Sequence, residues 1–198
     1  MMDCALNQAY DAFKIEADSI LETAKVIDRE QMRLAVEALS KAERIAAAGC
    51  GHSGIACRHF CHLMCCIERP ARFVSPADAV HGALGYMKKG DVMVLASRGG
   101  KTDELMTIID VCKTKGVTII GVTENLSSPL ATDADIVLAM KVTKECDKYN
   151  CQGTTSFTVL GAIFDALQTA VLERTGFQNE KFAVIHPNGA VGKRLNAK

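Results

Sequence analysis

Short apolar runs that alternate with helical segments constrain the fold of this 198-residue chain more than any other feature of its sequence. Runs this short and this apolar are typical of strands that are buried on both faces. Strands that alternate with helices form a parallel sheet covered by helices on both sides. The chain therefore belongs to the α/β class, with strands expected at residues 44–48, 72–74, 91–96, 117–122 and 136–142.

The remaining segments have helical patterns. Residues 5–39 predict two amphipathic helices with a break at 26–28, where Asp28 followed by Gln31 resembles a helix start. A long apolar helix is expected at 154–173. No linker, low-complexity tract or internal repeat divides the chain. We therefore expect one domain, in which residues 1–40 form a helical extension packed on residues 41–198.

Charge and hydropathy exclude several classes of protein. Lysine plus arginine number 23 and aspartate plus glutamate also number 23, without a basic run. Broad electrostatic attraction to nucleic acid or to a membrane surface is therefore not expected. No apolar stretch is expected to reach the length of about 20 residues that crosses a bilayer, and the N-terminus lacks the pattern of a signal peptide. These features predict a soluble, cytoplasmic protein.

The nine cysteines are odd in number, which argues against a disulfide framework. Cys57, Cys61 and Cys65 have helical spacing, with His59 and His62 nearby. Three thiols along one continuous helix form a poor tetrahedral cage for a metal. Packing of small apolar side chains on a helix face is the favoured interpretation, and no metal is expected.

Two glycine-rich loops follow predicted strands, and each of them opens a helix. The first is Gly51-His52-Ser53-Gly54, and the second spans residues 97–102. The N–H groups of a helix N-terminus attract anions, and ligands of parallel sheets bind at the carboxyl ends of the strands. The loops therefore predict a phosphate site, with candidate contacts from His52, Ser53, Ser97, Arg98, Gly99 and Thr102.

Two other interpretations of the first loop remain open. Gly49-x-Gly51-x-x-Gly54 also satisfies the dinucleotide-binding fingerprint. That fingerprint requires an acidic residue about 20 positions later, where this chain has Ser75-Pro76, although Asp78 is close. Alternatively, the glycines only permit tight turns between strand and helix. The phosphate interpretation is favoured because both loops occur together.

Four further side chains are candidates for proton transfer. Glu104 lies in the first helical turn after the second loop, and Glu145 follows the fifth predicted strand. His186 lies in a polar turn late in the chain, where a histidine is not needed for packing, and His81 is the fourth candidate near the crevice. Each carboxylate alone fits a solvated helix residue as well. Together, the carboxylates and imidazoles suit general acid–base chemistry near neutral pH.

Five stretches of the chain carry a resemblance to a known family. They are Gly51-x-Ser53-Gly54, Ser97-x-x-Gly100-x-Thr102, Pro-Ala-Asp-Ala-Val-His-Gly-Ala-Leu-Gly at 76–85, Lys144-Glu145, and His-Pro-Asn-Gly-Ala-Val-Gly-Lys-Arg at 186–194. Together they resemble the arabinose 5-phosphate isomerase branch of the sugar isomerase (SIS) family, over roughly residues 46–195.

The resemblance implies a three-layer α/β/α sandwich with a five-stranded parallel sheet, of the flavodoxin- or Rossmann-like type. It also implies a homotetramer with shared active sites. The family reaction interconverts D-ribulose 5-phosphate and D-arabinose 5-phosphate through an enediol, and it requires no metal or organic cofactor. We accordingly expect an isomerase that acts on a phosphorylated sugar without a cofactor.

The resemblance also implies roles for individual residues. Glu104, Glu145 and His186 match the acid–base residues proposed for the family, and His81 matches its second histidine. His186 is expected to come from a neighbouring subunit. The sugar-phosphate contacts are matched by Ser53, Ser97 and Thr102, and the hydroxyl-rich start of the long helix by Thr154, Thr155 and Ser156.

The chain departs from the family pattern at three positions. His52 replaces the usual lysine of the first loop, Ala83 replaces an aspartate, and Gly99 replaces a serine. Arg98 and Lys101 are expected to compensate for that serine at the phosphate.

Full-length members of the branch also carry a pair of regulatory domains after the catalytic one. Because this chain ends at Lys198, a form with the SIS domain alone is expected. Two alternative functions follow from the departures: a non-catalytic sensor of sugar phosphates, and an isomerase of another phosphosugar such as a phosphohexulose.

Overall fold

The structure is a computed structural model that describes residues 2–197. Residues 1 and 198, at which the predicted domain begins and ends, lie outside the described residues. Its five-stranded sheet has the order β2-β1-β3-β4-β5, and every neighbouring pair is parallel. All five predicted strands are present; the largest difference is that the fifth ends at residue 139 instead of 142. The strands are β1 (Ile45–Ala48), β2 (Ala71–Phe73), β3 (Val92–Ala96), β4 (Thr118–Thr123) and β5 (Ile136–Ala139).

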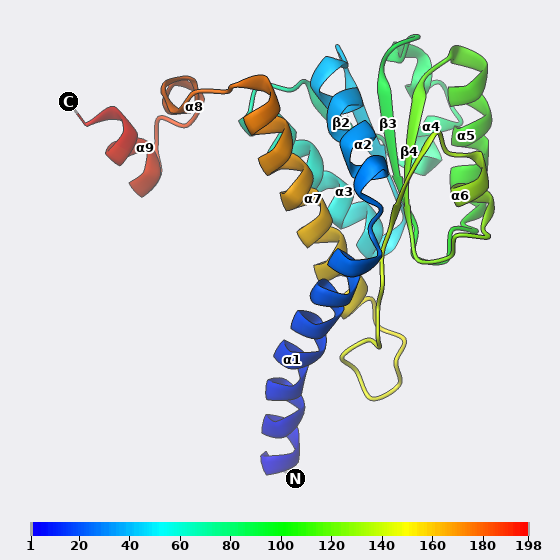
Figure 1. The fold of residues 1–198 in the computed structure, drawn as a ribbon, viewed down its shortest axis with the longest axis vertical. Helices are drawn as coiled ribbons and strands as arrows, with labels where there is room; N and C mark the ends of the chain where they lie inside the picture. Colours follow the sequence, from blue (N-terminus) through cyan, green and yellow to red (C-terminus); the bar gives the residue numbers. More distant parts are fainter. Residues whose placement is uncertain (1, 198) are drawn as a thin grey trace.

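Helices cover both faces of this sheet (Figure 1). The predicted helices are α1 (Met2–Val26), α2 (Arg29–Lys41), α3 (Gly51–Cys66), α5 (Asp103–Lys115) and α7 (Thr154–Thr175). Five short helices were not predicted: α4 (Pro76–Ala79), the 3-10 helix η1 (Ala83–Tyr86), α6 (Pro129–Asp133), α8 (Asn179–Ile185) and α9 (Gly189–Asn196).

Side chains on each strand alternate between two apolar cores. Ala47 and Val94 pack in the core shared with α2, α3 and α7. Their neighbours Ala46 and Met93 point to the opposite face, into the core shared with α5. Because successive residues of a strand face opposite sides of the sheet, continuous apolar strands require two covered faces. The predicted three-layer α/β/α sandwich is confirmed.

The N-terminal helices break where the sequence predicted. Asp28 is the N-cap of α2, and its carboxylate accepts a hydrogen bond from the backbone N–H of Gln31 at 2.9 Å. This bond satisfies one of the N–H groups that a helix start leaves without a partner inside the helix.

The same helices cover the outer edge of β5 and of the segment that follows it. Gln31 Oε1 accepts a hydrogen bond from Val137 N at 2.8 Å, and Thr23 Oγ1 accepts one from Lys141 N at 2.9 Å. Ser19 Oγ accepts from Thr143 N at 3.2 Å. An open strand edge exposes N–H groups that need partners. These contacts therefore fix the course of the chain towards Glu145.

Helix α7 corrects one expectation about apolar segments. Among the described residues, it is the one helix that is long and apolar enough to cross a membrane. Its residues Val159, Phe164 and Leu167 are fully buried against the sheet and the neighbouring helices. Packing in the core therefore accounts for the apolar residues on the buried face of α7.

The prediction that Cys57, Cys61 and Cys65 of α3 pack in the core is correct for two of the three residues. Cys57 and Cys61 lie in the core, and burial raises the pKa of the Cys61 thiol to about 12. Cys65, however, is exposed, so the packing interpretation is wrong for this residue. Within residues 2–197, no group of three or more His, Cys, Asp or Glu side chains is arranged to hold a metal ion.

Two parts of the chain extend away from the sheet and its helix layers: the first half of α1, and the pair α8 and α9 (Figure 1). Both carry large apolar side chains that are exposed within one chain. Tyr10 and Phe13 are 74% and 73% exposed on α1, and Val184 is 77% exposed on α8.

Candidate active site

The first loop is shaped by two glycines at the junction of β1 and α3. A Cβ atom at Gly54 would lie 2.5 Å from the carbonyl oxygen of Gly49, and one at Gly49 would lie 3.0 Å from the carbonyl carbon of Ser53. Backbone atoms cannot yield to such contacts. These two glycines are therefore required by the tight turn, which brings the N-terminus of α3 directly over the end of β1.

An open cleft of about 400 Å³ lies at the carboxyl ends of β1 and β2. Glu104, from the first turn of α5, shares this cleft with the backbone of the first loop. Burial, and after it the nearby Glu104 carboxylate, raises the pKa of the Cys50 thiol. The structure therefore brings Glu104 and the first loop together. The lining residues are Gly49, Cys50, Gly51, Gly54, Ile55, Arg58, Phe73, Ser75, Pro76, Ala77 and Glu104.

The hydroxyl groups of the second loop converge. Ser97 Oγ and Thr102 Oγ1 are 2.9 Å apart, and the N–H of Gly100 donates to Ser97 Oγ at 3.1 Å. Gly100 has a φ of +66°, in the left-handed region that favours glycine. This conformation curls the loop so that two hydroxyls meet at the start of α5, where the sequence predicted a phosphate site.

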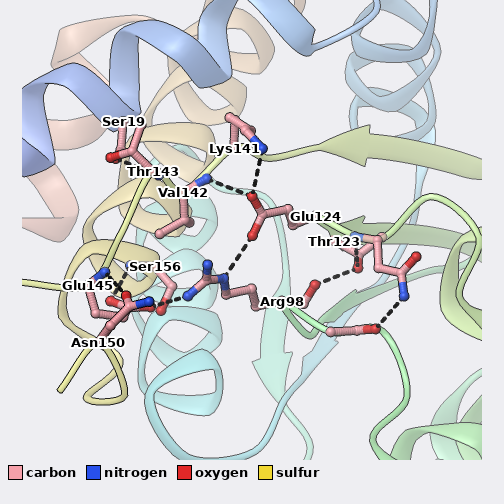
Figure 2. A network of polar contacts seen from close by, with 12 residues as sticks. Ser19, Arg98, Thr123, Glu124, Lys141, Val142, Thr143, Glu145, Asn150 and Ser156 are labelled. Carbon is pink, nitrogen blue, oxygen red and sulfur yellow. Dashed lines mark hydrogen bonds and ion pairs between the residues drawn. The ribbon is translucent and has the colours of Figure 1, made fainter.

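Glu145 is buried where the second loop meets the start of α7 (Figure 2). Its Oε1 accepts a hydrogen bond from Arg98 Nη1 at 2.8 Å. Its Oε2 accepts one from the backbone N–H of Ser156 at 3.1 Å and one from Thr154 Oγ1 at 3.4 Å. The side chain is only 3% exposed. The alternative that Glu145 is a solvated helix residue is therefore wrong, whereas Glu104 is exposed on α5.

Glu124 is a polar residue of this region that the sequence analysis missed. It pairs with Arg98 Nε at 2.8 Å and accepts a hydrogen bond from Val142 N at 3.1 Å. Burial raises the pKa of Glu124, but Arg98, the Val142 N–H and Lys141 together hold it below its usual range. Glu124 is therefore charged at neutral pH. Its position directly after β4 was the available signal, because Glu145 similarly follows β5.

Arg98 differs from the expectation drawn from its loop. Its guanidinium forms ion pairs with both Glu124 and Glu145, each at 2.8 Å (Figure 2). The two carboxylates neutralise the cation that was expected to compensate for Gly99 at the phosphate.

The first loop also reaches the start of α7. The ring of His52 packs edge-on against Phe157, with 6.3 Å between the ring centroids. A Cβ atom at Gly153 would lie 3.2 Å from the same imidazole. The structure therefore places His52 close to the candidate residues of α7, of which Thr155 and Ser156 are buried and Thr154 is half-buried.

The two predicted histidines lie outside this group within a single chain. His81 is exposed in the turn after α4, where its backbone N–H donates to the carbonyl oxygen of Asp78 at 3.0 Å. His186 is exposed at the end of α8, and its ring packs on Phe182 with 5.0 Å between centroids. One chain therefore supplies both candidate carboxylates, but it does not bring His186 to them.

The glycines around His186 have a local structural reason. Gly189 has a φ of +72°. A Cβ atom at Gly192 would overlap the carbonyl oxygen of His186 and would lie 2.7 Å from the carbonyl carbon of Pro187. The segment His186-Pro187-x-Gly189-x-x-Gly192 therefore forms the compact turn that joins α8 to α9.

Known proteins resemble this chain in both sequence and structure. The SIS domain family matches residues 38–170. The arabinose 5-phosphate isomerase KdsD of Pseudomonas aeruginosa is 34% identical over 193 residues, which cover 98% of this chain and 59% of the relative. The chain thus spans about three fifths of the length of the curated relatives it matches.

Two solved structures share the fold closely. A Listeria monocytogenes structure, for which a sugar-phosphate isomerase function has been suggested, has a TM-score of 0.91 and 40% identity, covering 95% of this chain and 99% of the other. An Escherichia coli CFT073 protein in complex with A5P has a TM-score of 0.87 and 26% identity, covering 93% and 98%.

Proposed function

Because the chain belongs to the SIS domain family, we propose that it is an aldose–ketose isomerase of sugar phosphates, with D-arabinose 5-phosphate and D-ribulose 5-phosphate as its substrate pair. The observation that carries this proposal is the buried Glu145 carboxylate, on which the second loop and the start of α7 converge. The similarity to arabinose 5-phosphate isomerases over nearly the whole chain supports the choice of substrate.

The proposed reaction transfers a proton between two neighbouring carbon atoms. A carboxylate removes the proton from C2 of the aldose while O1 gains a proton, which gives an enediol. The carboxylate then returns its proton to C1 while the O2 hydroxyl loses its proton, which gives the ketose, and other groups carry the protons between the two oxygens. Glu145 and Glu104 are the two candidate bases. The phosphate binds at the second loop, where the hydroxyls of Ser97 and Thr102 meet above the N-terminus of α5. No metal or organic cofactor takes part.

We propose that the active site is completed in a homotetramer, with His186 supplied by a neighbouring subunit. The pair α8 and α9 extends away from its own domain (Figure 1), and its exposed Val184 and Ile185 provide apolar surface for such a contact. The exposed apolar side chains at the start of α1 are a second candidate contact. The protein is proposed to be cytoplasmic, with residues 1–40 as a helical extension of a single domain.

A panel of phosphosugars tests this function. The purified protein is assayed for isomerisation of D-arabinose 5-phosphate and of a 3-hexulose 6-phosphate, and binding of each is followed by thermal unfolding. Preferential turnover of the pentose supports the proposal. Preferential turnover of the hexulose would indicate an isomerase with another substrate. Stabilisation by a phosphosugar without any turnover would indicate a sensor.

The substitution His52→Lys tests the departure in the first loop. Lysine is expected to preserve the turnover of D-arabinose 5-phosphate or to raise it by up to about tenfold, because its ammonium stays charged at neutral pH and its stem can cover Phe157. His59→Lys, on the exposed side of the same helix, is the matched control for steady-state kinetics. A sharp loss of turnover in His52→Lys alone would show that His52 serves another substrate or role.

A further inference from the structure

Arg98 links two carboxylates that follow two different strands, and it is the central member of the polar network in Figure 2. We propose that Arg98 is a positioning residue, which holds the Glu145 carboxylate in the orientation for proton transfer while Glu124 holds Arg98. This inference rests on the proposed isomerase function, and it gives Arg98 a role different from the phosphate contact expected from its loop.

The two oxygens of the Glu145 carboxylate differ in the hydrogen bonds that they accept. A carboxylate has about four acceptor positions on its two oxygens. Oε2 receives the N–H of Ser156 at 3.1 Å and lies 3.4 Å from the hydroxyl of Thr154. Oε1 receives only Arg98 Nη1. In the proposed reaction, the remaining position on Oε1 accepts the substrate proton, and Arg98 determines where that position points.

Arg98 can fix this orientation because Glu124 holds its side chain, and Glu124 is itself held by the backbone. Its Nε donates to Glu124 Oε2, and Glu124 Oε1 in turn accepts from Val142 N at 3.1 Å. The guanidinium is planar and rigid, so that fixing its Nε also fixes the direction of its Nη1. The backbone at Val142, just after β5, therefore holds Glu124, which holds Arg98, which in turn positions Glu145. A lysine at this position would carry the charge without the rigid fork.

Positioning and phosphate binding predict different kinetic effects. Loss of a phosphate contact weakens substrate binding and so raises KM, whereas misplacement of a proton-transfer group lowers kcat. A displacement of about 1 Å in a catalytic group can cost about 10²-fold in rate. We therefore expect Arg98→Met to lower kcat with D-arabinose 5-phosphate by about 30- to 100-fold and to leave KM within about twofold.

Arg33→Met is the matched control. Arg33 also pairs with two carboxylates, Glu30 and Glu37, but on the exposed surface of α2. This variant is expected to keep both kinetic constants. Arg98→Lys provides a second test, in case Arg98→Met does not fold. It retains the charge and is expected to lower kcat by about tenfold, again with little change in KM.

Combination with Glu145→Gln separates positioning from an independent role. If Arg98 acts through Glu145, the double variant Arg98→Met/Glu145→Gln has the same kcat as Glu145→Gln, because residues that act as a unit are not additive. Multiplied losses in the double variant would overturn the inference, and so would a raised KM with an unchanged kcat in Arg98→Met. A wild-type protein without turnover of any phosphosugar would instead overturn the proposed function, and the inference with it.

Discussion

Glu145→Gln is expected to lower kcat with D-arabinose 5-phosphate by about 10³-fold while substrate still binds. Glutamine preserves the volume of the side chain and removes the group that exchanges a proton. Its carbonyl oxygen can still accept the N–H of Ser156, but the ion pair with Arg98 is lost. We therefore also expect the free energy of unfolding to fall by about 1–3 kcal/mol.

Two measurements on this variant separate catalysis from folding. Steady-state kinetics give kcat, and the rise in melting temperature on addition of substrate reports binding. Glu37→Gln, which loses ion pairs on the surface of α2, is the control and is expected to behave like the wild type in both. Parallel loss of turnover and of substrate-induced stabilisation in Glu145→Gln would show that Glu145 is structural.

Among alanine substitutions of the glycines in the second loop, Gly100→Ala is expected to destabilise the protein most. A Cβ at Gly100 would overlap Ser128 Oγ, would lie 2.5 Å from Ser128 Cβ, and would require a positive φ that alanine rarely adopts. Ser128 cannot move aside easily, because it is buried and its Oγ accepts a hydrogen bond from Ala131 N at the start of α6. The free energy of unfolding should fall by about 2–4 kcal/mol.

The same substitution should displace the hydroxyls that are proposed to bind phosphate. The N–H of Gly100 donates to Ser97 Oγ, so a shifted loop should raise KM by about tenfold or more. Gly161→Ala is the contrasting control: it lies within α7, where an added Cβ meets nothing within 4 Å, and it should stabilise the helix by about 1 kcal/mol. A Gly100→Ala protein with the wild-type melting temperature and KM would contradict this account of the loop.

The sheet and the long helices were predictable because their signals are local. The steric alternation of strand side chains and the periodicity of helices appear directly in the sequence, and the Asp28 cap lies within three residues of its partner. The short helices were missed for a physical reason. Segments of four to eight residues such as α4, α6 and α9 are too short to be stable alone, so tertiary contacts and caps decide them.

The candidate site was predictable in its location but not in its contacts. Glu145 was expected at the end of the fifth strand, since parallel strands present their carboxyl ends to one crevice. Its burial and its ion pair with Arg98, 47 residues earlier in the chain, depend on how three loops meet in space. Glu124 was missed because its partner lies 26 residues away and its place directly after β4 was the one signal that the sequence offered.

The most direct test of the central claim is proton NMR of the protein with D-arabinose 5-phosphate in deuterated water, beside Glu145→Gln. Proton transfer through an enediol predicts formation of D-ribulose 5-phosphate and replacement of the C2 proton of the aldose by deuterium, both absent in the variant. Saturable binding of the sugar phosphate without conversion or exchange in the wild type would contradict the isomerase function and would favour a sensor of sugar phosphates.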